Sequence, residues 1–144
     1  MTKTYFHVAP GPLEVGSTKP KGHYGDLLKN DSRYVDEDPL GEFLREGIRQ
    51  TYYPDKPSRL SCSFVFESLE DAETFRTGRG KSEKIFRVQF VREPGSIHRV
   101  CWTAWSMAQP NLEQQARQYW ADPRVYDSNT ELFAEEDLVV LGEA

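Results

Sequence analysis

The sequence predicts an α+β fold in which the strands pair in an antiparallel manner. Segments with the spacing of helices and segments with the spacing of strands are mixed along the chain, without a regular strand–helix–strand alternation. Most connections between strands in the C-terminal half are short, and short connections join antiparallel rather than parallel strands. The chain has 144 residues, the size of one ordinary domain, and 38% of them are hydrophobic, which is enough to bury one core. We therefore expect a single domain spanning residues 1–144.

The first predicted strand lies near the N-terminus and contains a histidine. Tyr5, Phe6 and Val8 are β-forming residues, and a Pro-Gly-Pro turn at residues 10–12 prevents the strand from continuing. His7 should therefore lie near the end of the strand, beside a loop, where its ring can hydrogen-bond a ligand. The alternative is that His7 only satisfies a buried backbone partner.

Five further strands are predicted where β-forming residues lie between turn signals. They are residues 60–66, 85–91, 98–105, 130–134 and 138–141. Trp102 and Trp105 are expected in the core, because large aromatic side chains dominate core burial. Cys62 and Cys101 lie in two of these strands and are too few and too widely spaced for a disulfide framework. We predict that both are buried thiols.

Helical spacing predicts three helices with start or stop signals. The first covers residues 39–50 after an Asp38 cap, the second covers residues 68–78, and the third follows an Asn111 cap and stops at Asp122.

Two longer connections remain between these elements. Residues 17–38 are polar and predict a loop, or a short helix with a loop, in which Tyr24 and Tyr34 supply aromatic surface. Loops of this length usually have a function, so we expect this segment to cover a site or to contact a partner. Residues 51–59 predict an extended connection, because two prolines disfavour helix in the residues before them.

Composition excludes several classes of function. The net charge of −5 and the pI near 5.2 argue against a protein that binds nucleic acid through its phosphates. A locally basic groove is still compatible with this net charge. No apolar segment has the length of a membrane span or of a signal peptide, which predicts a cytoplasmic protein without a membrane partner. Three scattered histidines have no metal-ligand spacing, so we predict no metal site.

The order of three features resembles the ADP-ribosyltransferase superfamily. These are the sequence Tyr-Phe-His-Val at residues 5–8 before a turn, the strand 60–66 that runs into a helix at Ser68, and Glu131 at the start of a late strand. The similarity is closest to the branch of diphtheria toxin and the poly-ADP-ribose polymerases. The motifs P-S-R-L-S, D-A-x-x-F, Y-W and E-L-F are also similar to small uncharacterised bacterial and phage members. The resemblance implies a split, strongly bent pair of antiparallel β-sheets with flanking helices, and a cleft that holds the nicotinamide end of NAD.

The resemblance also implies roles for individual residues. His7 matches the histidine that contacts the adenosine ribose, and Glu131 matches the glutamate that binds the 2′-hydroxyl of the nicotinamide ribose. The family usually has a tyrosine in a middle strand that stacks on nicotinamide, but Ser63 stands at the best-aligned place. Phe64 and Phe66 are its neighbours in that strand, and Tyr52 or Tyr53 could supply the ring from the preceding connection.

Cleavage of the bond between nicotinamide and ribose builds positive charge on the sugar, and a nearby carboxylate stabilises that charge. Glu131 is the candidate catalytic residue, and its alternative interpretation is an ordinary charge on an edge strand. Glu135, Glu136 and Asp137 are interpreted as a solvated turn, from which one carboxylate would take the catalytic role if the strand register slipped.

Arginines are the candidates for the diphosphate of NAD. Arg59 precedes the strand at residues 60–66 and can make a bidentate contact with a phosphate, whereas its alternative roles are to cap a turn or to pair on the surface. Arg45 and Arg49 lie one helical turn apart, and for them a solvated helix face is the favoured interpretation over a phosphate-binding pair.

Together these observations predict a mono-ADP-ribosyltransferase that uses NAD to modify a protein or a nucleic acid. The alternatives are a catalytically inactive binding or inhibitor protein on the same fold and an NAD glycohydrolase. Asn129 stands where the arginine-modifying members of the family have a second glutamate. By resemblance, this argues against arginine as the modified group.

Overall fold

The structure is a computed structural model that describes residues 2–30, 39–79, 83–102, 110–121 and 129–144. Its strands are β1 Tyr5–Ala9, β2 Thr18–Lys19, β3 Ser63–Val65, β4 Lys84–Phe90, β5 His98–Cys101, β6 Thr130–Ala134 and β7 Leu138–Glu143. Its helices are α1 His23–Asn30, α2 Pro39–Tyr52, α3 Leu69–Arg79 and α4 Leu112–Ala121, with a short 3-10 helix, η2, at Arg59–Ser61.

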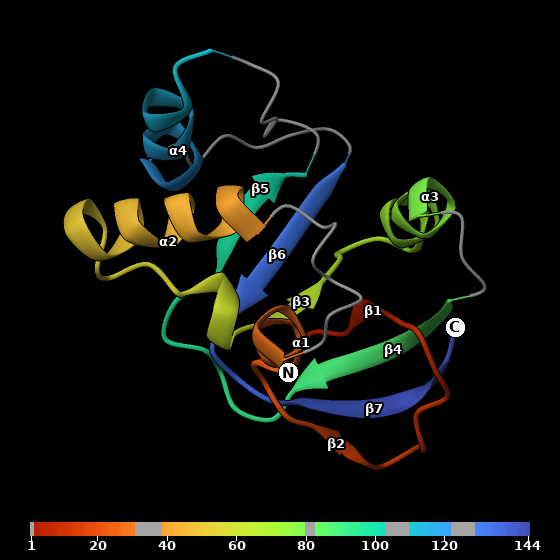
Figure 1. Ribbon diagram of the computed structural model, residues 1–144. Helices are drawn as coiled ribbons and strands as arrows, with labels where there is room; N and C mark the ends of the chain where they lie inside the picture. The colour runs from red at the N-terminus through yellow and green to blue at the C-terminus, as the bar shows by residue number, and fades with distance from the viewer. Residues whose placement is uncertain (1, 31–38, 80–82, 103–109, 122–128) are drawn as a thin grey trace.

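The strands form two antiparallel sheets (Figure 1). The first sheet has the order β1-β4-β7-β2 and the second has the order β3-β6-β5. The backbones of Phe6 and Phe66 join the two sheets through a pair of hydrogen bonds of 2.9 and 2.8 Å. The predicted α+β class with antiparallel pairing is therefore confirmed.

The main core lies between the two sheets, where apolar side chains from β1, β4 and β7 meet those from β3 and β6. A second cluster joins the second sheet to α2 and α4 through Ile48, Ala116, Trp120 and Phe133. The two helices therefore pack together on that sheet (Figure 1). A third cluster packs α3 near the junction of the sheets, with Phe66 and Ala72 at its centre and Trp102 at its edge.

Several predicted boundaries differ from those in the structure. The predicted strand at residues 60–66 begins as η2, because the Ser58 side chain accepts a hydrogen bond from the Leu60 N–H and caps the turn. The connection at residues 17–38 contains β2 and α1. Of the two cysteines, neither of which is in a disulfide within the described part of the chain, Cys62 is buried as predicted but Cys101 is only half-buried. Asp38, Tyr34, Trp105 and Asp122 lie outside the described residues.

Helix α1 lies close to η2 because it has a glycine where the two backbones meet. A Cβ added to Gly25 would lie 2.0 Å from the carbonyl oxygen of Leu60. In contrast, apart from its chain neighbours and the backbone of its own helix, no described heavy atom lies within 4 Å of a Cβ added to Gly47 in α2. Close approach therefore requires glycine at position 25 and not at position 47.

This difference predicts opposite effects for the same substitution at the two positions. Gly25→Ala should lower the free energy of unfolding by about 1–3 kcal/mol, because the added methyl group forces α1 away from η2. Gly47→Ala should raise it by about 0.4–1 kcal/mol, because alanine is the better helix former. Urea denaturation measures both changes. A Gly25→Ala variant as stable as the wild type would contradict the packing of α1 on η2.

Candidate functional site

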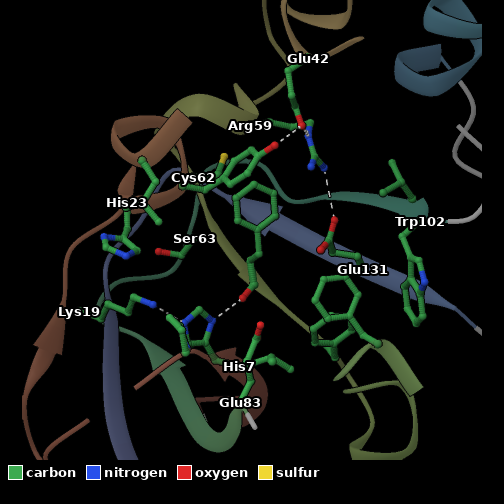
Figure 2. Close-up of a pocket in the computed structure, with 18 of the residues that line it drawn as sticks. His7, Lys19, His23, Glu42, Arg59, Cys62, Ser63, Glu83, Trp102 and Glu131 are labelled. Atoms are coloured by element: carbon green, nitrogen blue, oxygen red, sulfur yellow. Dashed lines mark hydrogen bonds and ion pairs between the residues drawn. The ribbon is translucent and has the colours of Figure 1, made fainter. Parts of the chain in front are cut away.

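A pocket of about 360 Å³ opens between the two sheets (Figure 2). Side chains from both sheets line it, together with side chains from the four helices and from η2. Five of the residues proposed from the sequence lie in this lining: His7, Arg59, Ser63, Phe64 and Glu131. His7 and Glu131 come from β1 and β6, in different sheets. The fold thus brings residues from the two ends of the sequence into one pocket.

Tyr52 does not belong to this group. Helix α2 continues through Tyr52, so the residue lies in its last turn and not in an extended connection as predicted. Its side chain is 48% exposed and packs under the Arg117 guanidinium, 3.8 Å from the ring centroid. The lining of the pocket does not include Tyr52. The structure therefore does not bring Tyr52 together with the other proposed residues.

Glu131 lies on the central strand of the second sheet. β6 pairs with β3 on one side and with β5 on the other, and every residue of β6 is buried. The interpretation of Glu131 as an edge-strand charge is therefore wrong. Its Oε1 accepts a hydrogen bond of 3.3 Å from Nη1 of Arg59. Burial raises the pKa of the Glu131 carboxyl above its ordinary value, and the charge of Arg59 opposes that shift.

Arg59 directs its guanidinium at groups of the protein itself. Its Nε donates to both oxygens of Glu42 at 2.9 and 3.1 Å, and its Nη1 donates to the Tyr119 hydroxyl at 2.8 Å. The guanidinium also lies 4.9 Å from the ring centroid of Phe64. Burial alone would lower the pKa of Arg59, but its anionic and phenolic neighbours raise it well above the ordinary value. These contacts match the alternative interpretation, in which Arg59 is a pairing residue, although the pair is buried rather than on the surface.

Glu42 completes the acidic side of this network. It is 2% exposed and accepts a hydrogen bond of 3.0 Å from the Tyr24 hydroxyl, in addition to those from Arg59. It also forms an ion pair of 3.1 Å with Nη2 of Arg45. Two carboxylates, Glu42 and Glu131, thus share two guanidinium groups inside the protein. This ion network (Glu42, Arg45, Arg59 and Glu131) has balanced formal charge.

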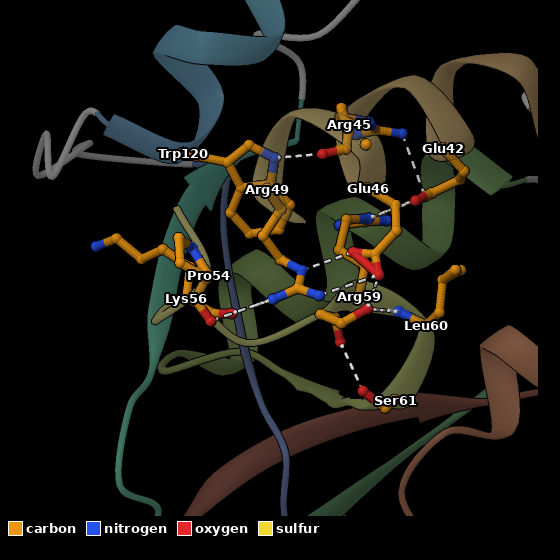
Figure 3. A network of polar contacts seen from close by, with 12 residues as sticks. Glu42, Arg45, Glu46, Arg49, Pro54, Lys56, Arg59, Leu60, Ser61 and Trp120 are labelled. Carbon is orange, nitrogen blue, oxygen red and sulfur yellow. Dashed lines mark hydrogen bonds and ion pairs between the residues drawn. The ribbon is translucent and has the colours of Figure 1, made fainter. Parts of the chain in front are cut away.

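The predicted solvated face of α2 is wrong for both of its arginines. Arg45 is buried and pairs with Glu42, whereas Arg49 is bound by Glu46 and by the carbonyl oxygen of Lys56 at 3.0 Å (Figure 3). Both ion pairs have i,i+3 spacing on α2, the spacing that is also found on solvated helices. Only Arg45 lines the pocket, so the two arginines do not form a phosphate-binding pair.

Aromatic rings close the pocket around the carboxylate. Tyr24 of α1 packs edge-on against Phe64, with ring centroids 5.6 Å apart. Trp102 and Phe75 meet at a second wall, with centroids 5.4 Å apart. Trp102, predicted as a core residue, is half-buried and faces the pocket. Tyr24 was expected only as loop surface, and its distance in sequence from Phe64 left no local signal for this contact.

Ser63 has a structural partner in the same region. Its hydroxyl donates to the carbonyl oxygen of Glu136 at 2.7 Å and so ties β3 to the turn after β6. Glu135 in that turn accepts hydrogen bonds from the Ser58 N–H and from the Ser61 hydroxyl. The carboxylates of that turn are absent from the pocket lining, whereas Glu131 is present.

His7 is a neutral ring with a defined tautomer. A carbonyl oxygen only accepts hydrogen bonds, so the 2.7 Å contact between Nδ1 and the Phe64 oxygen shows that Nδ1 carries the proton. Nε2 then accepts a hydrogen bond of 2.8 Å from Nζ of Lys19. Burial, and secondarily the charge of Lys19, lowers the pKa of His7 to about 3. His7 thus both satisfies a backbone partner, as its alternative interpretation requires, and lines the pocket.

Neither a metal cluster nor a membrane-spanning helix is found in the described parts of the chain. Within those ranges, no three His, Cys, Asp or Glu side chains are grouped so that they could hold a metal ion. None of the described helices combines the length and the apolar character needed to cross a bilayer.

Comparison with known proteins gives a family but no activity. The model of a family described as "Protein of unknown function (DUF2441)" matches residues 26–143. Because this match covers most of the chain, the protein belongs to that family. No curated protein matches the chain. The matched region contains Glu42, Arg59 and Glu131, whereas His7 and Lys19 precede it.

Proposed function

For this member of a family of unknown function, we propose a mono-ADP-ribosyltransferase that transfers ADP-ribose from NAD to a protein or nucleic-acid target. The proposal depends above all on one observation: a buried glutamate, Glu131, shares a pocket between two antiparallel sheets with the strand histidine His7. This arrangement supports the resemblance to ADP-ribosyltransferases with a split, bent pair of sheets.

The pocket lining suits the nicotinamide riboside half of NAD. Its volume of about 360 Å³ is near the lower end of the range of small-molecule sites, about 300–1,000 Å³. Phe64 and Tyr24 offer ring surfaces for a flat heterocycle, and the neutral His7 ring, held by Phe64 and Lys19, lines the same pocket. Arg59 donates to only one oxygen of Glu131, and among the described residues no other group hydrogen-bonds that carboxylate. Its second oxygen is therefore the one that can accept a hydrogen bond from the ribose 2′-hydroxyl.

The proposed reaction breaks the bond between the ribose C1′ and the nicotinamide nitrogen. The bonding electron pair leaves with nicotinamide, which becomes neutral, and the positive charge that develops on the ribose is stabilised by the Glu131 carboxylate. A nucleophilic group of the target then forms a bond to C1′ and loses its proton. Burial strengthens the electrostatic effect of Glu131, because an interaction between charges grows as the local dielectric constant falls.

Incubation of the purified protein with labelled NAD and a cell lysate tests this proposal. We expect label on a macromolecule, and digestion with protease or nuclease identifies which class is modified. A thermal shift with NAD far above its dissociation constant provides a separate test of binding, because a ligand that binds only the folded state raises Tm. If NAD causes neither a shift in Tm nor any labelling, the proposal is wrong.

A catalytically inactive NAD-binding protein is the second candidate, and two observations favour it. Glu131 is held by Arg59, and the middle strand has Ser63 in place of the family's tyrosine, with its hydroxyl engaged by Glu136. This candidate predicts a rise in Tm with NAD but neither labelled macromolecule nor release of nicotinamide. Release of free ADP-ribose without a labelled macromolecule would instead identify an NAD glycohydrolase.

A further inference from the structure

The pocket has a basic corner formed by His7, Lys19 and His23 (Figure 2). These residues come from β1, β2 and the first position of α1. In Figure 2 the corner lies away from Arg59 and Glu131, so it is separate from the charge-balanced ion network.

Lys19 is the charged member of this corner and binds a neutral partner. Its Nζ donates to Nε2 of His7, which carries no charge because its only ring proton is on Nδ1. The ion pairs found among the described residues do not include Lys19. Glu83 also lines the pocket, and its charge raises the pKa of Lys19, but burial has the larger effect and lowers that pKa.

A partly buried ammonium group without a direct ion pair destabilises the folded state, because it has lost part of its hydration, and the charge of Glu83 offsets this effect only in part. The N-terminal end of α1, where His23 is the first residue, adds positive potential to the corner. The N-terminal end of a helix carries partial positive charge. In contrast, the Arg59 guanidinium is already neutralised by Glu42 and Glu131. The group in the pocket that still needs an anion is therefore Lys19.

We propose that the basic corner is a phosphate-binding site, in which Lys19 is the charged ligand for the diphosphate of a dinucleotide. Lysine binds phosphate as a point charge, and the His23 ring can add a hydrogen bond. The assignment of that diphosphate to NAD depends on the proposed function, whereas the anion site itself does not. In this arrangement the role expected of Arg59 from the sequence belongs to Lys19.

Calorimetric titration with inorganic pyrophosphate, with ADP-ribose and with adenosine tests the site directly. We expect the wild type to bind pyrophosphate and ADP-ribose, with an affinity that falls as salt is added. Lys19→Met should weaken both at least about tenfold, the effect of losing one charged hydrogen bond. Adenosine, which has no phosphate, should bind equally to both proteins.

Lys21→Met is the matched control, because Lys21 is exposed, lies two residues away and is absent from the pocket lining. It removes the same charge and should leave pyrophosphate affinity unchanged. Lys19→Met should also fold with a Tm at least as high as that of the wild type, since it removes a partly buried charge that has no direct ion pair. A wild type that does not bind pyrophosphate, or an equal loss in the two variants, would overturn the proposal.

A second readout follows the His23 ring by NMR. In the free protein, burial and the charge of Lys19 lower the pKa of His23, whereas Asp26 raises it. Bound pyrophosphate should raise that pKa, because a nearby anion favours the protonated ring.

Pyrophosphate binding that requires Lys19 in a protein without NAD turnover would support the anion site and refute the proposed function. NAD turnover with an unchanged KM in Lys19→Met would refute the assignment of the NAD diphosphate to this site and leave the proposed function intact.

Discussion

Replacement of Glu131 by glutamine is expected to lower NAD turnover at least about a hundredfold while leaving NAD affinity nearly unchanged. Glutamine keeps the shape of the side chain, and its amide oxygen can still accept the hydrogen bond from Arg59. It lacks the negative charge that the developing positive charge on the ribose requires. The loss should therefore fall on kcat, and calorimetry with NAD should show little change in affinity.

Glu135→Gln is the control for this experiment. Glu135 lies four residues further along the chain, in the turn after β6, and is absent from the pocket lining. The same change of charge there should leave turnover unaltered. An equal loss of turnover in the two variants would show that the catalytic carboxylate has been misplaced.

The pH dependence of turnover gives a further check on Glu131. The ionised carboxylate is the active form, and burial raises its pKa above the ordinary value. Turnover by the wild type should therefore fall as the pH is lowered towards that raised pKa, and it should be constant above it. Residual turnover of Glu131→Gln should lack this decrease.

The fold was largely predictable because its strands show their pattern locally. The alternating apolar residues of β4 and the turns around β1, β6 and β7 place these strands within two residues of their observed ends. Helix ends were predicted to the same accuracy, and the largest difference is the two residues by which α2 exceeds its predicted end. Because α2 is two residues longer than predicted, Tyr52 lies at an exposed position of the helix and not in the predicted connection.

The candidate site was only partly predictable, since its polar partners are far apart in sequence. His7 and Glu131 were proposed from motif positions, and the fold places both in the pocket. Glu42 and Arg45 carry the spacing of an ordinary solvated ion pair, and only the packing of α2 buries them. Lys19 looked like one of several loop lysines until the short strand β2 placed it beside His7.

Arg59→Met should have the largest effect on stability of any substitution in the ion network. Methionine fills part of the same space but leaves Glu131 without its hydrogen-bond donor and removes one of the two guanidinium partners of Glu42. Loss of one member of a buried ion pair lowers the free energy of unfolding by about 3–5 kcal/mol. Arg92→Met, at an exposed position in the turn after β4, is the matched control and should be nearly as stable as the wild type.

Two further measurements connect this loss of stability to Glu131. Without Arg59 the pKa of the buried Glu131 carboxyl should rise further, so that the folded state binds a proton more tightly than the unfolded state does. Stability then rises as the pH falls through the folded-state pKa, and the deficit of Arg59→Met should be smaller at pH 5 than at pH 7.5 in urea denaturation. The double variant Arg59→Met/Glu131→Gln removes the stranded charge and should recover part of the loss at pH 7.5, which a double-mutant cycle measures as a coupling energy. Strictly additive losses, or a deficit independent of pH, would show that Arg59 acts through its packing against the surrounding rings and not through its charge.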